Sequence, residues 1–174
     1  MVLVAVCLAV AAIACKSERS RVTVQNEEPP PESHLLSTIP MNNAAAAPQL
    51  LSGFYAVENN MWRWTAGKFS VRLGVPPAAA QSGVTVALSF VIPDAAIRKL
   101  QKITIAASAG GMQLNSQSYD TAGPYVFNAD IPAGPLLNSE SVTVDFTVDK
   151  TFRPDGGDRR DLAIIANSVS LAAK

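Results

Sequence analysis

The sequence contains few of the side chains on which most enzyme sites depend. Its two cysteines, Cys7 and Cys15, lie within the first 15 of 174 residues, so the rest of the chain has no thiol for a disulfide, a metal site or a nucleophile. His34 is the only histidine, which excludes a Ser-His-Asp relay and a zinc site with several imidazoles. We therefore predict no catalytic residue, no metal and no cofactor.

Charge is also scarce and balanced. The 14 basic residues equal the 14 acidic ones, and charged residues make up only 16% of the chain. With no excess positive charge, there is no long-range field to attract nucleic acid, which we exclude as a partner. Hydrophobic residues reach 48%, enough for one packed domain and too many for disorder throughout.

The chain begins with an apolar run, Val2 to Ala14, which is shorter than the roughly 20 residues of a membrane-spanning helix. Such a run is typical of a secretory signal. It ends in "AIAC", followed abruptly by "KSERSR", and this resembles the lipobox of bacterial lipoproteins. The resemblance implies a signal peptide over 1–14, a lipidated Cys15 and attachment to a membrane of the bacterial cell envelope. An ordinary cleaved signal and a short buried helix are the alternatives. By the same resemblance, Lys16 favours the outer membrane in a diderm bacterium.

Residues 15–50 differ in composition from the remainder of the chain. The segments "NEEPPPESH" and "PMNNAAAAPQ" are rich in proline, glutamate and small residues and show no period of 2 or 3.6. Such a segment cannot bury enough apolar area to offset the entropy lost on ordering it. We expect 15–50 to be a flexible tether.

From residue 51 onward the pattern alternates between apolar and polar positions. In "ESVTVDFTVD" the apolar positions are Val142, Val144, Phe146 and Val148, which indicates a half-buried strand. The same period appears in "GVTVALSFVI" and "KITIAA", and turn-rich segments such as "SAGG" and "IPAGP" separate the strands. One short helix is expected in "DAAIRKL". The pattern predicts an all-β fold over 51–174, a two-sheet antiparallel β-sandwich of jelly-roll type.

Both tryptophans lie in "NNMWRWTAGKFSVRL". If 65–68 form a turn, Trp64 faces Phe69 and Trp62 faces Val71 across a hairpin, and Arg63 points to the opposite, outer face. This register favours the core for Trp64. It leaves Trp62 open between the core and a stacking surface for a sugar ring.

A second polar segment, "TFRPDGGDRRDLAI", spans 151–164. Its aspartates, Asp155, Asp158 and Asp161, could supply oxygen ligands to calcium, although their order does not fit a helix-loop-helix calcium site. We favour a solvated loop in which the neighbouring arginines pair with these aspartates.

Two segments together, "GFYAVENNMWRWTAGKFSVRL" and "TFRPDGGDRRDLAIIANSVSL", resemble the small β-sandwich domains of bacterial cell-surface and polysaccharide-biosynthesis proteins. The resemblance covers most of 51–174, and Ala163 departs from it where glycine is usual. It implies that the polar motif positions gather at one end of the domain and that they hold carbohydrate. The motif positions are Tyr55, Glu58, Arg63, Trp64, Phe152, Pro154, Asp158, Arg160 and Leu162.

We therefore predict a non-catalytic, lipid-anchored envelope protein whose domain binds a glycan or an envelope protein. The candidate ligand-binding residues are Glu58, Trp62, Arg63, Asp158 and Arg160. In a competing interpretation, Glu58, Arg63, Asp158 and Arg160 form an ion-pair network in a purely structural or assembly domain. A glycoside hydrolase, with Glu58 as one of its carboxyl groups, is the less favoured third interpretation.

Overall fold

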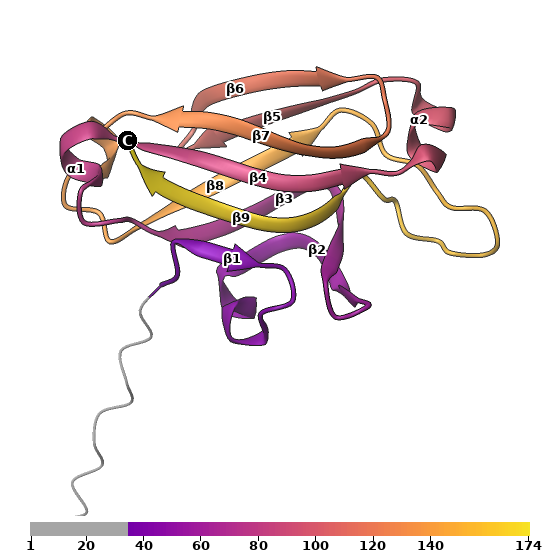
Figure 1. Ribbon diagram of the computed structural model, residues 1–174, viewed down its shortest axis with the longest axis horizontal. Coiled ribbons are helices and arrows are strands. Elements are labelled where there is room, and N and C mark those ends of the chain that lie inside the picture. The colour runs from indigo at the N-terminus through magenta and orange to yellow at the C-terminus, as the bar shows by residue number, and fades with distance from the viewer. Residues whose placement is uncertain (1–34) are drawn as a thin grey trace, which may run out of the picture. The chain divides into compact units, whose positions relative to one another are not determined.

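The computed structural model describes residues 35–174, which fold around one antiparallel β-sheet (Figure 1). Within these residues, two α-helices and two short 3-10 helices connect the strands. No helix in this part of the chain is both long and apolar enough to cross a membrane. The elements are β1 (Thr38–Pro40), η1 (Ala44–Gln49), β2 (Leu50–Glu58), β3 (Trp62–Gly74), α1 (Ala79–Ser82), β4 (Val84–Ile92), α2 (Asp94–Leu100), β5 (Ile103–Ala109), β6 (Met112–Tyr119), β7 (Gly123–Ile131), η2 (Gly134–Leu136), β8 (Ser141–Val148) and β9 (Ile165–Ala173).

The strands follow the order β6-β5-β8-β3-β9-β4-β7, with β1 beside β9 and β2 beside β3. Strand β3 connects β6, β5 and β8 on one side of the sheet with β9, β4 and β7 on the other. It pairs with β8 from Lys68 to Gly74 and with β9 through Arg63 and Trp64. The sheet curls until it is nearly closed and barrel-like. The all-β, antiparallel prediction is confirmed. A division into two separate sheets is not confirmed, since hydrogen bonds run continuously through β3.

The core lies inside the curled sheet and is built from the alternating strands that the sequence indicates. In β4 every second residue from Val84 to Ile92 is fully buried. Phe69 of β3 stacks on Phe146 of β8 with ring centroids 5.0 Å apart, and Phe127 of β7 meets Phe146 edge-on. Aromatic contacts of this kind stabilise the core beyond the burial of apolar area, and here they connect β3, β8 and β7 across the interior.

The folded part begins before residue 51, so the predicted tether, 15–50, reaches too far. Strand β1 pairs with β9, and the side chains of Ile39 and Met41 are fully buried. Gln49 donates to the carbonyl oxygens of Leu36 and Arg72, which fastens this segment to β3. These contacts depend on partners far along the chain, so composition alone did not reveal them. The predicted signal peptide, Cys15 and the tether up to residue 34 lie outside the described residues.

The predicted hairpin turn at 65–68 is wrong. Residues 62–74 form one continuous strand, β3, and the turn lies at Asn59 and Asn60, where both residues have positive φ angles. A type I′ hairpin turn requires that conformation at both central positions, and asparagine tolerates it well. The Asn-Asn pair was the signal that could have located the turn.

Candidate functional site

The structure brings Glu58, Asp158 and Arg160 into direct contact. Glu58 ends β2, whereas Asp158 and Arg160 belong to the loop between β8 and β9, about a hundred residues later. Arg160 Nη1 lies 2.8 Å from Glu58 Oε1, and Arg160 Nη2 lies 2.7 Å from Asp158 Oδ2. Arg160 Nε also donates to Asp158, so all three guanidinium nitrogens bind carboxylates of this chain.

Tyr55 of β2 completes this group, which we call the Arg160 cluster: Tyr55, Glu58, Asp158 and Arg160. The Arg160 guanidinium carbon lies 5.2 Å from the centroid of the Tyr55 ring, within cation-π range. The Tyr55 hydroxyl donates to the carbonyl oxygen of Asp161 at 3.1 Å. Tyr55 belongs to the sequence motif but is not among the predicted ligand-binding residues. Its position three residues before Glu58 gave no sign that it would contact Arg160.

The base of the loop is closed by a second set of contacts. Phe152 and Leu162 exchange two backbone hydrogen bonds of 2.9 Å, which form an isolated β-bridge. The ring of Phe152 meets Trp64 edge-on at a centroid distance of 5.9 Å. Trp64 is therefore packed against the core, as predicted, but through the loop and not through Phe69 across a hairpin.

Arg63 does not point outward, as the predicted hairpin required. Because β3 is continuous, Arg63 shares a face with Thr65, whose side chain is fully buried. Its Nε donates to the carbonyl oxygen of Met41 and its Nη1 to that of Tyr55, both at 2.9 Å. Arg63 thus ties three chain segments together and takes no part in the ion pairs of the Arg160 cluster.

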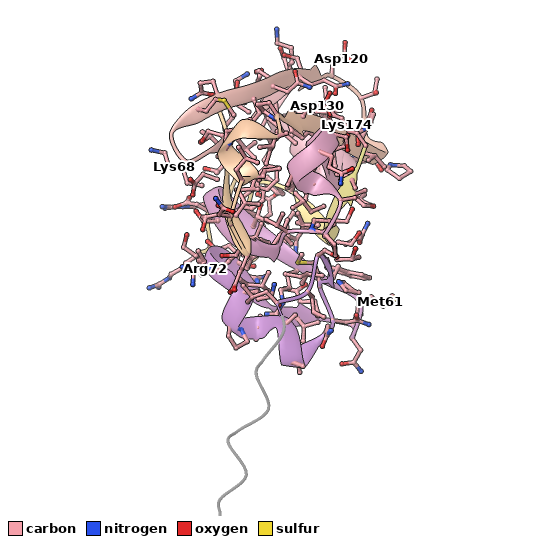
Figure 2. The ribbon with its side chains drawn as sticks, turned by 90° about the vertical axis from the view of Figure 1, so that its left-hand side faces the viewer. Met61, Lys68, Arg72, Asp120, Asp130 and Lys174 are labelled. Atoms are coloured by element: carbon pink, nitrogen blue, oxygen red, sulfur yellow. The ribbon has the colours of Figure 1, made fainter. Side chains whose placement is uncertain are left out.

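Trp62 is partly buried and does not face Val71, since both belong to the same strand. Its indole Nε1 is buried and has no hydrogen-bond partner within residues 35–174. On the neighbouring hairpin turn, Met61 is exposed and its side chain lies at the surface in Figure 2.

Each of the three aspartates of the loop has a basic partner. Asp155 pairs with Lys99, Asp158 with Arg160 and Asp161 with Arg153. In each case hydrogen bonding to the cation lowers the pKa of the carboxyl group below its usual value. Conversely, the two carboxylates raise the pKa of Arg160. These aspartates are arranged as ion pairs, and within 35–174 no group of three or more acidic, His or Cys side chains is placed to hold a metal.

Comparison with known proteins adds little. No protein-family model matches the sequence, and no curated protein matches it significantly. Among solved structures, the chain is similar to dimeric latent PorU from Porphyromonas gingivalis, with a TM-score of 0.41 and 8% identity over 80% of this chain. The chain spans only 12% of that structure's length. Similarity this low says nothing about what the chain binds.

Proposed function

We propose that this chain is a non-catalytic, lipid-anchored protein of the bacterial envelope whose β domain is an assembly module. In this proposal the Arg160 cluster is a structural lock that holds the loop at 151–164 against β2. The proposal rests on the contacts of the Arg160 guanidinium. Each of its three nitrogens donates to a carboxylate of the chain itself, and the Tyr55 ring lies within cation-π range.

The electrostatics support a role without catalysis. A glycoside hydrolase needs one carboxylic acid with a raised pKa to protonate the leaving group. Asp158 has a lowered pKa because Arg160 binds it, so it stays ionised and cannot serve as that acid. The other carboxylate of the cluster, Glu58, is held by the same guanidinium.

Glycan binding by the cluster is the second candidate. The side chains of Glu58, Arg160 and Asp158 keep 36%, 34% and 29% of their surface exposed. Carboxylate oxygens that remain accessible can accept hydrogen bonds from sugar hydroxyls while they stay paired with Arg160. Trp62, whose indole N–H has no hydrogen-bond partner within residues 35–174, would report such binding through its fluorescence.

One experiment separates the two candidates. The protein and its Arg160→Ala variant are melted with and without a panel of envelope polysaccharides, and tryptophan fluorescence is followed in parallel. The structural lock predicts a lower melting temperature for Arg160→Ala and no glycan that raises the melting temperature of either protein. A polysaccharide that stabilises the parent but not the Arg160→Ala variant would establish glycan binding at the cluster instead. An Arg160→Ala variant as stable as the parent would refute the lock.

The anchor is tested separately. Metabolic labelling with a fatty acid should modify the parent chain and leave Cys15→Ser unmodified. An unlabelled parent, or equal labelling of both, would refute the lipid anchor without affecting the proposed role of the cluster.

A further inference from the structure

The loops at one end of the domain carry almost no charge. Two loops, 75–83 and 132–140, lie there together, because the end of β3 pairs with the start of β8 and the start of β4 pairs with the end of β7. The amide of Val75 donates to the carbonyl oxygen of Glu140 at 2.9 Å, which joins the two loops directly. Glu140 is the one charged residue that they contain. We call these two loops the apolar end; Figure 1 shows it at the side of α1 and the C-terminus.

The opposite end of the domain is rich in charge. Loops 93–102 and 149–164 meet there, where Lys99 donates to the carbonyl oxygen of Arg153 at 2.9 Å. These two loops contain twelve charged residues, among them two members of the Arg160 cluster. Both ends consist of connecting loops, which usually expose polar and charged side chains to water. The contrast therefore lies between the two ends and not between loops and strands.

Several apolar side chains of the apolar end face solvent. Leu137 keeps 57% of its surface exposed. The other exposed apolar residues of these loops are Pro77, Ala78, Ala80, Pro132 and Pro135. The neighbouring charges of Lys174 and Asp130, labelled in Figure 2, form an ion pair of 2.9 Å. Single exposed apolar residues are ordinary, but a group of them without charges in between is typical of an interaction surface.

The chain also enters the described domain at the apolar end. The amide of Gly74, the last residue of β3, donates to the carbonyl oxygen of Leu36 at 3.0 Å. A Cβ atom at Gly74 would collide with the backbone of Leu35, so the two segments are in close contact. Leu35 and Leu36 keep 37% and 38% of their surface exposed and extend the apolar surface. Residues 16–34, which separate Cys15 from the domain, therefore join it at this end.

We propose that the apolar end docks on the surface of the lipid bilayer. This inference rests on the proposed lipid anchor at Cys15 and names the surface of the domain that turns toward the membrane. Leu137, Leu35 and Leu36 enter the boundary between headgroups and acyl chains, as the apolar face of an interfacial segment does. The charged opposite end, with the Arg160 cluster, then faces away from the bilayer into water.

The anchor makes weak docking sufficient. Fully extended, residues 16–34 reach roughly 65 Å, so the anchor alone does not decide which end of the domain faces the bilayer. It does hold the domain near the bilayer at an effective concentration of about millimolar. A few exposed apolar side chains are then enough to orient the domain. Charged loops would not dock in this way, because their side chains would lose hydration without gaining a partner.

The test is fluorescence quenching on the full, lipid-bearing chain in vesicles of phosphatidylethanolamine and phosphatidylglycerol that contain a nitroxide-labelled lipid. The fluorophore is attached to a single introduced cysteine, since the chain has no thiol after Cys15. Leu137→Cys and Met61→Cys form a matched pair, because both side chains are 57% exposed and Met61 precedes β3 at the opposite end. The label at 137 should be quenched at least about twofold more strongly than the label at 61.

A second pair of variants tests whether the apolar side chains are responsible. With the fluorophore on Ala80→Cys, the added change Leu137→Glu should weaken quenching by the nitroxide lipid, because a carboxylate resists transfer out of water. The matched change Met61→Glu should leave quenching as it is in Ala80→Cys alone. Both changes are at exposed positions, and circular dichroism should show the same fold in all variants.

Fatty-acid labelling and flotation of the same samples distinguish failure of the anchor from failure of the docking. A chain without fatty acid would refute the anchor and the docking that rests on it. A chain that carries the fatty acid but is quenched equally at 137 and 61 would overturn the docking alone. An equal loss of quenching with Leu137→Glu and Met61→Glu would do the same.

The other possible occupants give a different result. If the label at 137 is shielded from iodide in the water but is not reached by the nitroxide lipid, the chain itself or a second copy covers the apolar end. That outcome would overturn the docking as well.

Discussion

Replacement of Arg63 by alanine tests whether this residue supports the fold or binds a ligand. The change removes two charge-assisted hydrogen bonds, to the carbonyl oxygens of Met41 and Tyr55, and leaves both acceptors short of a donor. A hydrogen bond to a charged group contributes roughly 1.5–3 kcal/mol when buried, and partial exposure of Arg63 reduces this. We expect Arg63→Ala to lower the free energy of unfolding by about 2–4 kcal/mol.

For a domain of this size, 1 kcal/mol corresponds to roughly 3–5 °C in melting temperature, so a fall of about 10 °C is expected. The assay is unfolding by urea and by heat, followed by circular dichroism. Arg63→Lys should recover only part of the loss, because an ammonium group does not present the two fixed, divergent donors of a guanidinium. Equal stability of Arg63→Ala and the parent would refute the structural role of Arg63, whether or not glycan binding changed.

Arg72 provides the matched control on the same strand. Its side chain is exposed and projects from the surface in Figure 2, on the same side of the molecule as Lys68. Within residues 35–174 its guanidinium makes no ion pair or hydrogen bond, and Arg72→Ala should therefore change stability by less than about 0.5 kcal/mol. A loss as large as that of Arg63→Ala would show that general charge removal, and not the two hydrogen bonds, is being measured.

Three other outcomes are expected from the structure. Gly53→Ala should lower the free energy of unfolding, measured in urea, by more than about 2 kcal/mol, because φ is +74° there and a Cβ atom would collide with the carbonyl oxygen of Lys68. The control Gly134→Ala should be nearly neutral, because a Cβ atom there meets open space. Stability should fall in acid, because the folded-state pKa of Asp158 lies below its unfolded value of about 4. The stabilisation from Asp158 is complete above the unfolded value and is lost as the pH drops through the folded-state pKa. Arg160→Ala should make the free energy of unfolding, measured in urea, depend less on pH in this range. In alkali, burial raises the pKa of Tyr119 to about 12, so urea unfolding should show stability lost between pH 10 and 12, and Tyr119→Phe should remove that loss.

The strands were the most predictable feature. Alternation in 84–92 and 141–148 places one set of side chains on the buried face, and the structure has these faces in the core. Period 2 is a local property that every residue of a strand reports, so it survives without knowledge of the partners. The short helix predicted in "DAAIRKL" is present as α2, which begins at Asp94.

The candidate site was predicted only in part. The motif selected Glu58, Asp158 and Arg160, which the structure joins, and it also selected Arg63, which the structure assigns to a different set of contacts. The difference arose from one misplaced turn. Moving the turn from 65–68 to 59–60 makes β3 continuous and reverses the face on which Arg63 stands.

Composition and local pattern were enough to predict the all-β class, the alternation of strands such as β4 and β8, and a chain with no thiol after Cys15 and no histidine besides His34. These depend on composition and on neighbours two residues away. The order of the strands, the inclusion of 38–49 in the fold and the partners of Arg160 became known from the folded chain. Those depend on contacts between residues about 100 positions apart, such as Glu58 and Arg160, whose pairing no local pattern encodes.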